Sequence, residues 1–451
     1  MDDLRTFLDE ITRNDPHQLL TITEKVAIDY TATALAFELE KRGKAPVLLF
    51  ENLEGFENLK LVANIFASRE TMARSVGVEA KDFYNKVSDC LDALLPAEVI
   101  SQGPVHELVW TGSEADLTRL PVSYHFSEDA GPYITAGMVA ARDPDTGVGN
   151  LAYARLQVKG PQLLGASLHS RQHLWDYFQR AQKAGKDLPV AVVIGAHPAV
   201  MLAAAAKMGI DQDEYDLAGA LMGTPLQLCR ALTVDVDVPA HAEIVIEGYL
   251  LADTFEEEGP FGEYTGYTTG RSTNNALKVT AITMRNSPIF VDIIPGNSSE
   301  HLILGGISKQ AWVFKRMKEA LPFFMDFHYP PSGTHFQAFV RINKTAEGQP
   351  QQAAQLMFGL DHYLKLVIVV DSDIDPTSES NVLWAMATRM QADKDISIIP
   401  NSLCNMLDPS SKDGVGAKMM VDATGSLEAS FSRLTIPTET KQKVIQLLDG
   451  K

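Results

Sequence analysis

The sequence predicts a mixed α/β (α+β) protein built from three successive units. Helical and strand-like apolar patterns alternate at both ends of the chain, whereas its middle is rich in short strand patterns punctuated by glycine. At about 150 residues per domain, 451 residues allow two or three domains. We expect an N-terminal α/β domain over residues 1–110, a largely β domain over 111–300, a linker helix over 301–322 and a C-terminal α/β domain over 323–451.

The individual patterns support this division. In the first unit, residues 4–11 and 31–39 have helical spacing and residues 47–50 form a short apolar run typical of a buried strand. The central unit contains six strand patterns, at residues 135–141, 151–158, 190–194, 244–250, 277–283 and 289–293. Two helices are expected between these strands, over residues 198–208 and 214–221.

A long helical pattern over residues 302–321 leads out of the central unit. Beyond it, strand and helix patterns alternate again, which indicates a small α/β domain. The expected strands cover residues 336–342 and 366–370, and the expected helices cover residues 350–359, 382–390 and 439–448.

The charge balance argues against nucleic acid and anionic membranes as partners. The chain has 39 Lys and Arg residues against 58 Asp and Glu residues, a net charge of -19. Its three cysteines are far apart and lack metal-type spacing, its first residues are acidic, and its apolar stretches are shorter than the ~20 residues that span a bilayer. These features predict a cytoplasmic protein with reduced thiols.

The most informative segment is Glu-Gly-Pro-Phe-Gly-Glu at residues 258–263. Glycine and proline favour a tight turn that could bring Glu258 and Glu263 to one point. An acidic loop of this kind is often only a solvated hairpin. The neighbouring aromatic residues Phe261, Tyr264 and Tyr267 argue against that interpretation.

A cationic residue with apolar neighbours provides a possible partner for these acids. Strand alternation over residues 149–155 places Tyr153 and Arg155 on one face. Because a buried arginine needs a carboxylate, Glu258 and Glu263 are candidate partners. A purely structural ion pair with another acid is the alternative.

A third set of residues suits a divalent cation. Asn150, His173 and Glu214 would offer an amide oxygen, an imidazole and a carboxylate, which fit Mn²⁺ or Mg²⁺ bound together with a phosphate. The three are distant in sequence, so spacing alone is a weak signal. An isolated histidine such as His173 is more often a surface or core residue.

Taken together, these stretches resemble the UbiD family of decarboxylases, which use prenylated flavin mononucleotide (prenylated FMN). The resemblance runs in order through most of the chain, at residues 149–155, around His173, and at residues 214–223, 238–248, 258–267, 295–297 and 418–424. It implies a central split β-barrel of flavin-reductase type that binds the cofactor, and a C-terminal oligomerisation domain. It also implies a homodimer or homohexamer and a flavin prenyltransferase that supplies the cofactor.

The resemblance also implies roles for individual residues. Arg155, Glu258 and Glu263 look like the family's catalytic network, with Glu263 as the proton donor. The expected ligands of Mn²⁺ (or Mg²⁺), with K⁺ nearby, are Asn150, His173 and Glu214. The expected contacts to prenylated FMN are Asn150, Arg155, Gln172, His173, Glu214 and Lys418.

The implied reaction is the reversible, non-oxidative decarboxylation of an aromatic or heteroaromatic acid through covalent adducts between substrate and cofactor. Loss of CO₂ from an sp² carbon needs an electron sink that no side chain provides. His301 lies where the furoate, pyrrole and indole carboxylate branch has a polar residue facing the ring; a histidine that satisfies a helix start is the alternative. Phenazine and hydroxybenzoate acids are further candidate substrates.

Two other functions remain open from sequence. An oxidoreductase with ordinary flavin could use the same scaffold, but it would not need two acids around an arginine. A non-catalytic subunit of a decarboxylase complex could retain the fold, but its acids would be dispensable.

Overall fold

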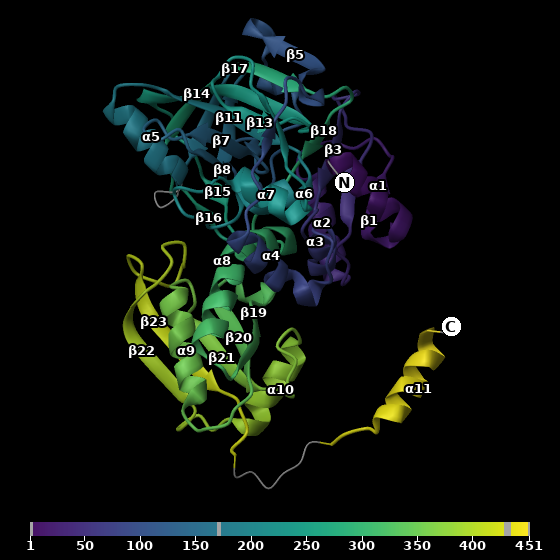
Figure 1. Cartoon of the computed structure of the whole chain (residues 1–451), viewed down its shortest axis with the longest axis vertical. Helices are drawn as coiled ribbons and strands as arrows, with labels where there is room; N and C mark the ends of the chain where they lie inside the picture. Colours follow the sequence, from purple (N-terminus) through teal and green to yellow (C-terminus); the bar gives the residue numbers. More distant parts are fainter. Residues whose placement is uncertain (1–2, 169–172, 428–433, 450–451) are drawn as a thin grey trace.

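The structure is a computed structural model that describes residues 3–168, 173–427 and 434–449. It has the predicted mixed α/β (α+β) class (Figure 1). One large apolar core is shared by the N-terminal and central parts, and two smaller cores lie in the C-terminal domain. In the described part of the chain, no helix is both long and apolar enough to cross a membrane.

The N-terminal part contains a small sheet in the order β1-β2-β3-β18. Its strands are β1 (Leu19–Ile22), β2 (Val47–Phe50), β3 (Lys60–Ala63) and β18 (Ile289–Val291), and its helices are α1 (Leu4–Asn14), α2 (Thr31–Lys41), α3 (Arg69–Arg74) and α4 (Phe83–Asp92). Strand β18 pairs in parallel with β3. The strand expected at 289–293 therefore exists, but it completes the N-terminal sheet instead of the central one.

The central part is a nine-stranded sheet in the order β6-β9-β10-β17-β14-β11-β7-β8, with β5 beside β17. The strands are β5 (Leu108–Thr111), β6 (Tyr133–Ile134), β7 (Met138–Arg142), β8 (Gly149–Tyr153), β9 (Arg155–Gly160), β10 (Leu163–Ser167), β11 (Leu188–Ile194), β14 (Ile244–Phe255) and β17 (Asn275–Met284). Helices α5 (His173–Lys183), α6 (Pro198–Ala204) and α7 (Glu214–Met222) accompany it. A separate small sheet joins β4 (Glu98–Val99), β12 (Gln227–Arg230) and β13 (Asp237–Pro239).

The single strand predicted over residues 151–158 is wrong, because the chain forms two strands separated by Ala154. Strand β8 pairs with β7, whereas β9 pairs with β6 and β10 near the other end of the strand order. One residue can join them only if the two ends of the sheet approach each other. The sheet must therefore curl into a half-barrel, and Arg155 enters the site from its seam.

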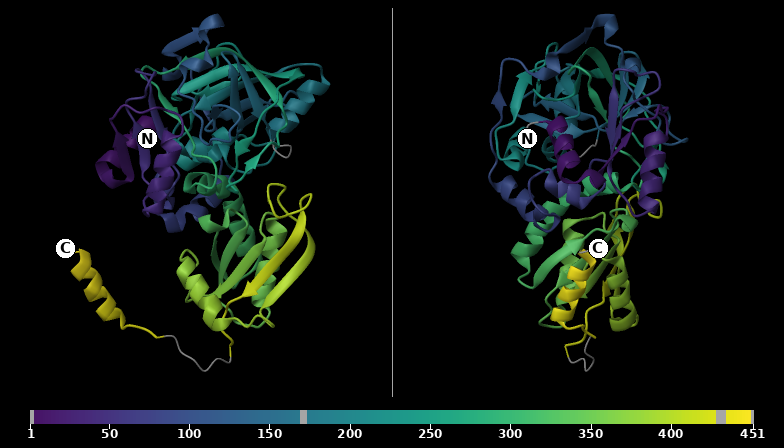
Figure 2. Two further views of the ribbon diagram at one scale, coloured as in Figure 1. Left: turned by 180° about the vertical axis from the view of Figure 1, so that it is seen from behind. Right: turned by 90° about the vertical axis from the view of Figure 1, so that its right-hand side faces the viewer.

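A long helix, α8 (Ser299–Ala320), occupies the stretch where the linker helix is expected and leads into the C-terminal domain (Figures 1 and 2). This domain contains a five-stranded sheet in the order β19-β20-β21-β23-β22. Its strands are β19 (Phe324–His328), β20 (Gln337–Ile342), β21 (Leu366–Asp371), β22 (Ile396–Leu403) and β23 (Val415–Asp422). The sequence patterns did not predict β22 and β23.

The C-terminal sheet has helices on both faces. Helices α8 and α9 (Gln349–Leu360) contribute to one core, and α10 (Glu379–Arg389) contributes to the other. The last helix, α11 (Thr438–Asp449), lies away from the rest of the chain (Figures 1 and 2).

Candidate active site

Arg155 lies between the two acids of the predicted turn. Its Nε and Nη2 donate to the two oxygens of Glu258, each at 2.9 Å, and its Nη1 donates to Oε1 of Glu263 at 2.5 Å. Nη2 also donates to the main-chain oxygen of Arg271 at 2.7 Å. The side chain of Glu258 is fully buried, whereas those of Arg155 and Glu263 are 13% and 14% exposed. Glu258 is thus bound at both oxygens, and Glu263 meets Arg155 through one.

The electrostatic environment keeps Arg155 charged. Burial by itself would lower the pKa of Arg155, but the hydrogen bonds and charge of Glu258, with the charge of Glu263, leave that pKa raised. The Arg155 guanidinium also lies 5.2 Å from the centre of the Phe261 ring. Two carboxylates share one cation. One carboxylate can therefore take up a proton while Arg155 stays charged and paired with the other.

The turn that carries the acids is a short hairpin of β15 (Phe261–Gly262) and β16 (Thr268–Thr269). The amide of Glu263 donates to the oxygen of Tyr267, and the amide of Gly266 donates to the oxygen of Glu263. Gly266 has a φ of 79°, which suits glycine. These bonds fix the backbone at Glu263.

Asp129 supports the same turn from a neighbouring loop. Its Oδ1 accepts from the amide of Gly262 at 3.0 Å, and its Oδ2 accepts from the amides of His125 and Phe126. Asp129 is buried, and a β-carbon on Gly262 would lie 2.5 Å from the Phe126 ring. Sequence reasoning missed Asp129, because a lone acid in a polar loop gives no distinctive pattern.

An aromatic cluster faces the acids from the linker helix and the C-terminal domain. The ring of Tyr264 makes edge contacts with His301, His335 and Phe336, at centroid distances of 6.1, 5.3 and 6.0 Å. Its hydroxyl accepts from Nδ2 of Asn405 at 2.5 Å. The residue next to Glu263 is therefore bonded directly to the C-terminal domain. Asn405 and His335 were not predicted, since only the tertiary fold brings them here.

His301, the predicted substrate contact, lies in the first turn of α8. Its Nδ1–H donates to the oxygen of Gly296 at 3.0 Å, which leaves Nε2 as an acceptor in the neutral ring. Burial lowers the pKa of His301 to about 4, so the ring is neutral near pH 7. The alternative of a histidine that satisfies a main-chain group near the helix start is thus also realised.

Two of the predicted metal ligands lie side by side. Asn150 on β8 and Glu214 at the start of α7 are 2% and 4% exposed, and Oε2 of Glu214 accepts from the amide of Leu151 at 2.8 Å. Burial raises the pKa of Glu214 to about 8. Nδ2 of Asn150 is buried without a hydrogen-bond partner, and the amide can turn its oxygen into the same position. A buried acid without a cation, beside an unsatisfied amide, fits a divalent ion.

The third predicted ligand, His173, is the first residue of α5 and is partly buried. Burial lowers its pKa, which favours the neutral form that binds metals. Helix α5 contacts β8, the strand that contains Asn150. The described residues contain no group of three or more His, Cys, Asp or Glu side chains that could hold a metal. The predicted set depends on an asparagine, and Gln172 lies outside the described residues.

Lys418, the remaining predicted cofactor contact, lies in the C-terminal domain. It lies on β23 of the C-terminal sheet, is 6% exposed, and donates to the main-chain oxygens of His362 and Leu364 at 3.0 and 2.6 Å. Its ammonium group thus supports a turn of its own domain. Its contact with prenylated FMN stays a prediction from the family resemblance.

Comparison with known proteins identifies the class to which this fold and site belong. The N-terminal, Rift-related (UbiD) and C-terminal domains of 3-octaprenyl-4-hydroxybenzoate carboxy-lyase match residues 13–91, 98–298 and 302–423. The anhydromevalonate phosphate decarboxylase of Methanothermobacter thermautotrophicus is 30% identical, over 96% of this chain and 99% of that protein. The chain belongs to the UbiD family of carboxy-lyases, which confirms the predicted family and decarboxylase class.

Solved structures of similar proteins have the same fold over nearly the whole chain. The UbiD-class enzyme HmfF from Pelotomaculum thermopropionicum, in complex with FMN, has a TM-score of 0.93 and 38% identity, covering 98% of this chain and 99% of that one. An evolved dimeric form of HmfF with prenylated FMN gives 0.89 and 36%, covering 99% and 100%. The vanillic acid decarboxylase of Sedimentibacter hydroxybenzoicus is 28% identical; its open form gives 0.89 (100% and 99% covered) and its closed form 0.82 (99% of each).

Proposed function

We propose that this protein is a reversible, non-oxidative decarboxylase of an aromatic or heteroaromatic acid that works with prenylated FMN. The observation that carries the proposal is Arg155 held between Glu258 and Glu263. The relatives solved with FMN and prenylated FMN support the cofactor. When bound, prenylated FMN would supply the electron sink that the side chains lack.

The unequal binding of the two acids supports different roles for them. Glu258 is buried and bound at both oxygens by Arg155, so it serves as a fixed countercharge. Glu263 meets Arg155 through one oxygen and is partly exposed, so it can move a proton to and from the reacting carbon. Arg155 orients both acids and can bind the substrate carboxylate as the cluster rearranges.

Asn150, His173 and Glu214 would hold Mn²⁺ or Mg²⁺ against the cofactor phosphate, with K⁺ nearby. The support is the buried carboxyl of Glu214, which has no cationic partner among the described residues, beside the unsatisfied amide of Asn150. A divalent cation would replace the missing positive charge. Gln172 remains a candidate cofactor contact from sequence alone.

The substrate side of the site, which contains His301 and His335, favours a substrate with a planar ring and no second anionic group. His301 and His335 are neutral near pH 7, because burial lowers their pKa values to about 4 and 3. The nearby cation Lys309 is already bound to Asp361 at 2.8 Å. Nε2 of His301 accepts hydrogen bonds, so a pyrrole or indole N–H would be a better partner than a furan oxygen.

A phosphorylated substrate, such as the one named for the Methanothermobacter relative, fits this site less well. A phosphate group would need cations that are not already paired with acids. Arg155 and Lys309 both have carboxylate partners, and Lys418 already donates to two main-chain oxygens.

The Glu263→Gln variant tests the assignment of the proton donor. The protein should be co-expressed with a flavin prenyltransferase and supplied with Mn²⁺. Release of CO₂ from furoate, pyrrole, indole, phenazine and hydroxybenzoate acids is then measured, with anhydromevalonate phosphate as a comparison. We expect turnover of a ring acid by the wild type, with a loss of at least ~10²-fold in Glu263→Gln and an unchanged flavin spectrum.

Glu257→Gln is the matched control, because this neighbouring acid does not contact Arg155. An active Glu263→Gln protein would reject the assigned proton donor, whereas a wild type that binds the cofactor but turns over none of these acids would favour a non-catalytic subunit. Turnover of the phosphorylated acid alone would reject the aromatic substrate class, and an ordinary-flavin spectrum with redox activity would indicate an oxidoreductase.

We further propose that the chain acts in the cytoplasm as a homodimer or homohexamer joined through its C-terminal domain. Exposed apolar side chains on this domain and on α11 support an association surface, namely Leu383, Trp384, Ile398, Leu403, Val444, Ile445 and Leu447. The C-terminal domain would also close over the site during turnover, as the open and closed forms of the vanillic acid decarboxylase suggest.

A further inference from the structure

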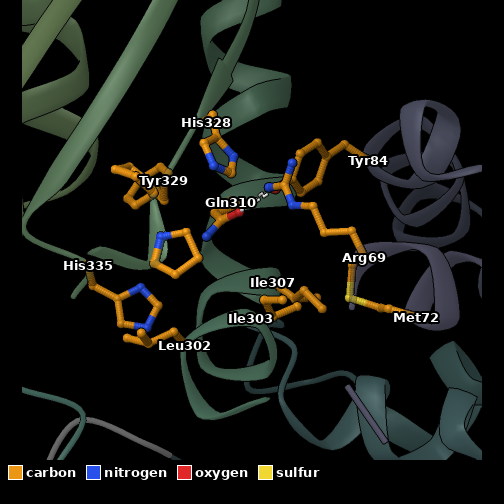
Figure 3. A pocket seen from close by; sticks show the side chains of 12 residues that line it. Arg69, Met72, Tyr84, Leu302, Ile303, Ile307, Gln310, His328, Tyr329 and His335 are labelled. Carbon is orange, nitrogen blue, oxygen red and sulfur yellow. Dashed lines mark hydrogen bonds between the residues drawn. The ribbon is translucent and has the colours of Figure 1, made fainter. Parts of the chain in front are cut away.

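A small cavity lies on the side of α8 away from His301, where the N-terminal and C-terminal domains both meet this helix (Figure 3). At about 100° per residue, Ile303, Ile307 and Gln310 lie on the face of α8 opposite His301. All three line the cavity. The acid pair does not line the cavity, nor does any residue assigned above to cofactor, metal or proton transfer, although His335, which contacts Tyr264, forms part of its wall.

Arg69 brings a positive charge to this cavity without an acidic partner. Its Nη2 donates to the hydroxyl of Tyr84 at 2.5 Å and to Oε1 of Gln310 at 3.4 Å, and both acceptors are neutral. Within the described ranges, Arg69 takes part in no salt bridge. Figure 3 shows its guanidinium beside Tyr84 and Gln310. A half-buried guanidinium with only neutral partners is a site for an anion.

His328 on β19 provides an independent observation. The residue is 8% exposed and lines the same cavity, and its Nδ1 is buried without a hydrogen-bond partner. Burial, with a further effect of the Arg69 charge, lowers the pKa of His328 to about 3. His328 is thus a neutral imidazole near a cation, with a buried polar atom left to pair.

The volume and the lining residues of the cavity restrict the size and the charge of a possible ligand. Its volume is about 60 Å³. At roughly 10–15 Å³ for each water-sized position, this leaves room for about four to six heavy atoms. Met72, Ile303 and Ile307 make part of the wall apolar. A single cation, two neutral imidazoles (His328 and His335) and apolar walls suit a small planar monoanion better than a phosphate dianion or an aromatic acid.

We propose that Arg69 and His328 form a binding site for a small carboxylate or bicarbonate ion at the junction of α3, α8 and β19. The guanidinium fork would bind two anion oxygens, and Nδ1 of His328 would donate to one of them. The ion would link the N-terminal domain to the C-terminal domain. Bicarbonate has the same planar, singly charged group and forms by hydration of CO₂, the product of this enzyme class.

The test measures the thermal midpoint of the full-length protein with added sodium acetate or sodium bicarbonate. Each salt is raised to about 50 mM against sodium chloride at constant ionic strength. We expect a saturable rise in the midpoint with one or both anions. In Arg69→Gln the half-saturating concentration should increase at least about 10-fold, as expected for loss of a charged hydrogen-bonding partner.

His328→Gln is the second variant, and a smaller weakening of about 3-fold or more is expected from it. Arg316→Gln is the matched control on α8, the helix that lines the cavity, because Arg316 is exposed and pairs with Glu319; it should bind like the wild type. Saturation by bicarbonate alone would identify the hydrated product as the ligand, and saturation by both would identify a carboxylate site. No saturable effect of either anion beyond chloride, or an unchanged response in both variants, would overturn the proposal.

Discussion

At the scale of single residues, Arg155 binds both carboxylate oxygens of Glu258 but only one of Glu263. This difference gives the two acids different roles in the proposed mechanism. Three histidines around α8, of which His328 and His335 are buried and His301 is partly buried, add a second electrostatic feature. Burial lowers the pKa values of His301, His328 and His335 to about 4, 3 and 3, compared with 6.5 for the free side chain. Near neutral pH these residues provide polar atoms without charge, and at His301 and His335 this makes the substrate side suitable for a neutral ring.

The lowered pKa values predict how stability changes in acid. Below pH 6.5 the unfolded chain binds protons at these histidines, whereas the folded protein does so only near pH 3–4. The free energy of unfolding should therefore fall as the pH falls from 6.5 towards 4. His335→Gln should remove about 2–3 kcal/mol of that loss.

Urea unfolding of the wild type and the variant at pH 6.5 and pH 4.5 measures this effect. His17→Gln serves as the control, because His17 is exposed. The same acid-induced loss in His335→Gln as in the wild type would contradict the assigned burial effect.

At the scale of elements, the acid turn is held from outside by the loop that contains Asp129. A two-residue strand pair such as β15–β16 is too short to fix a side chain alone. The Asp129 carboxylate binds the amide of Gly262, directly before Glu263. The position of the proposed proton donor thus depends on a residue that does not contact Arg155.

Asp129→Ala should therefore lower kcat by about 10- to 100-fold with little change in KM, because the turn is displaced while the substrate pocket remains. Asp129→Asn retains one amide oxygen as an acceptor and should recover part of the rate. Steady-state kinetics on the best ring acid gives both constants.

Glu128→Ala is the control, since this neighbouring residue is exposed. Equal rates for Asp129→Ala and Glu128→Ala would show that the turn does not need the Asp129 carboxylate. Thermal midpoints of both variants would identify simple unfolding.

At the scale of the whole molecule, Tyr264 connects the acid turn to the C-terminal domain. Its ring packs against His301 on α8 and against His335, while its hydroxyl accepts from Asn405. The proposed closure of the C-terminal domain would therefore act directly on the residue beside Glu263.

Tyr264→Phe keeps the ring contacts and loses the hydrogen bond to Asn405. We expect KM to rise about 3- to 10-fold, in line with the loss of one hydrogen bond. Asn405→Ala removes this bond and also the bond that its Oδ1 accepts from the amide of Leu407, so its effect should be at least as large, and the double variant should be no worse than Asn405→Ala alone.

Tyr267→Phe is the matched control from the same turn, because Tyr267 is 64% exposed. Additive effects of Tyr264→Phe and Asn405→Ala would contradict a direct coupling. Small-angle scattering of the single variants would report any opening of the domain.

The sequence by itself determined the α/β class, the family, and the positions of most helices and strands. Periodicity marks α1, β2, α8 and α9 because each buries one face or one run of apolar residues. The sequence also indicated that Arg155 needs an acidic partner and that residues 258–263 form a turn. Strand β22 was missed because its side chains are largely exposed, and β23 was missed because two of its four buried residues, Lys418 and Asp422, are charged.

Only the tertiary structure decided which residues meet. The curl of the central sheet places Arg155 at the seam beside Glu258 and Glu263, and the path of α8 brings Tyr264 to Asn405. It also placed Lys418 in the C-terminal domain and Arg69 beside His328. Such contacts join residues far apart in the chain, and their energy depends on distance and burial, which local sequence patterns do not contain.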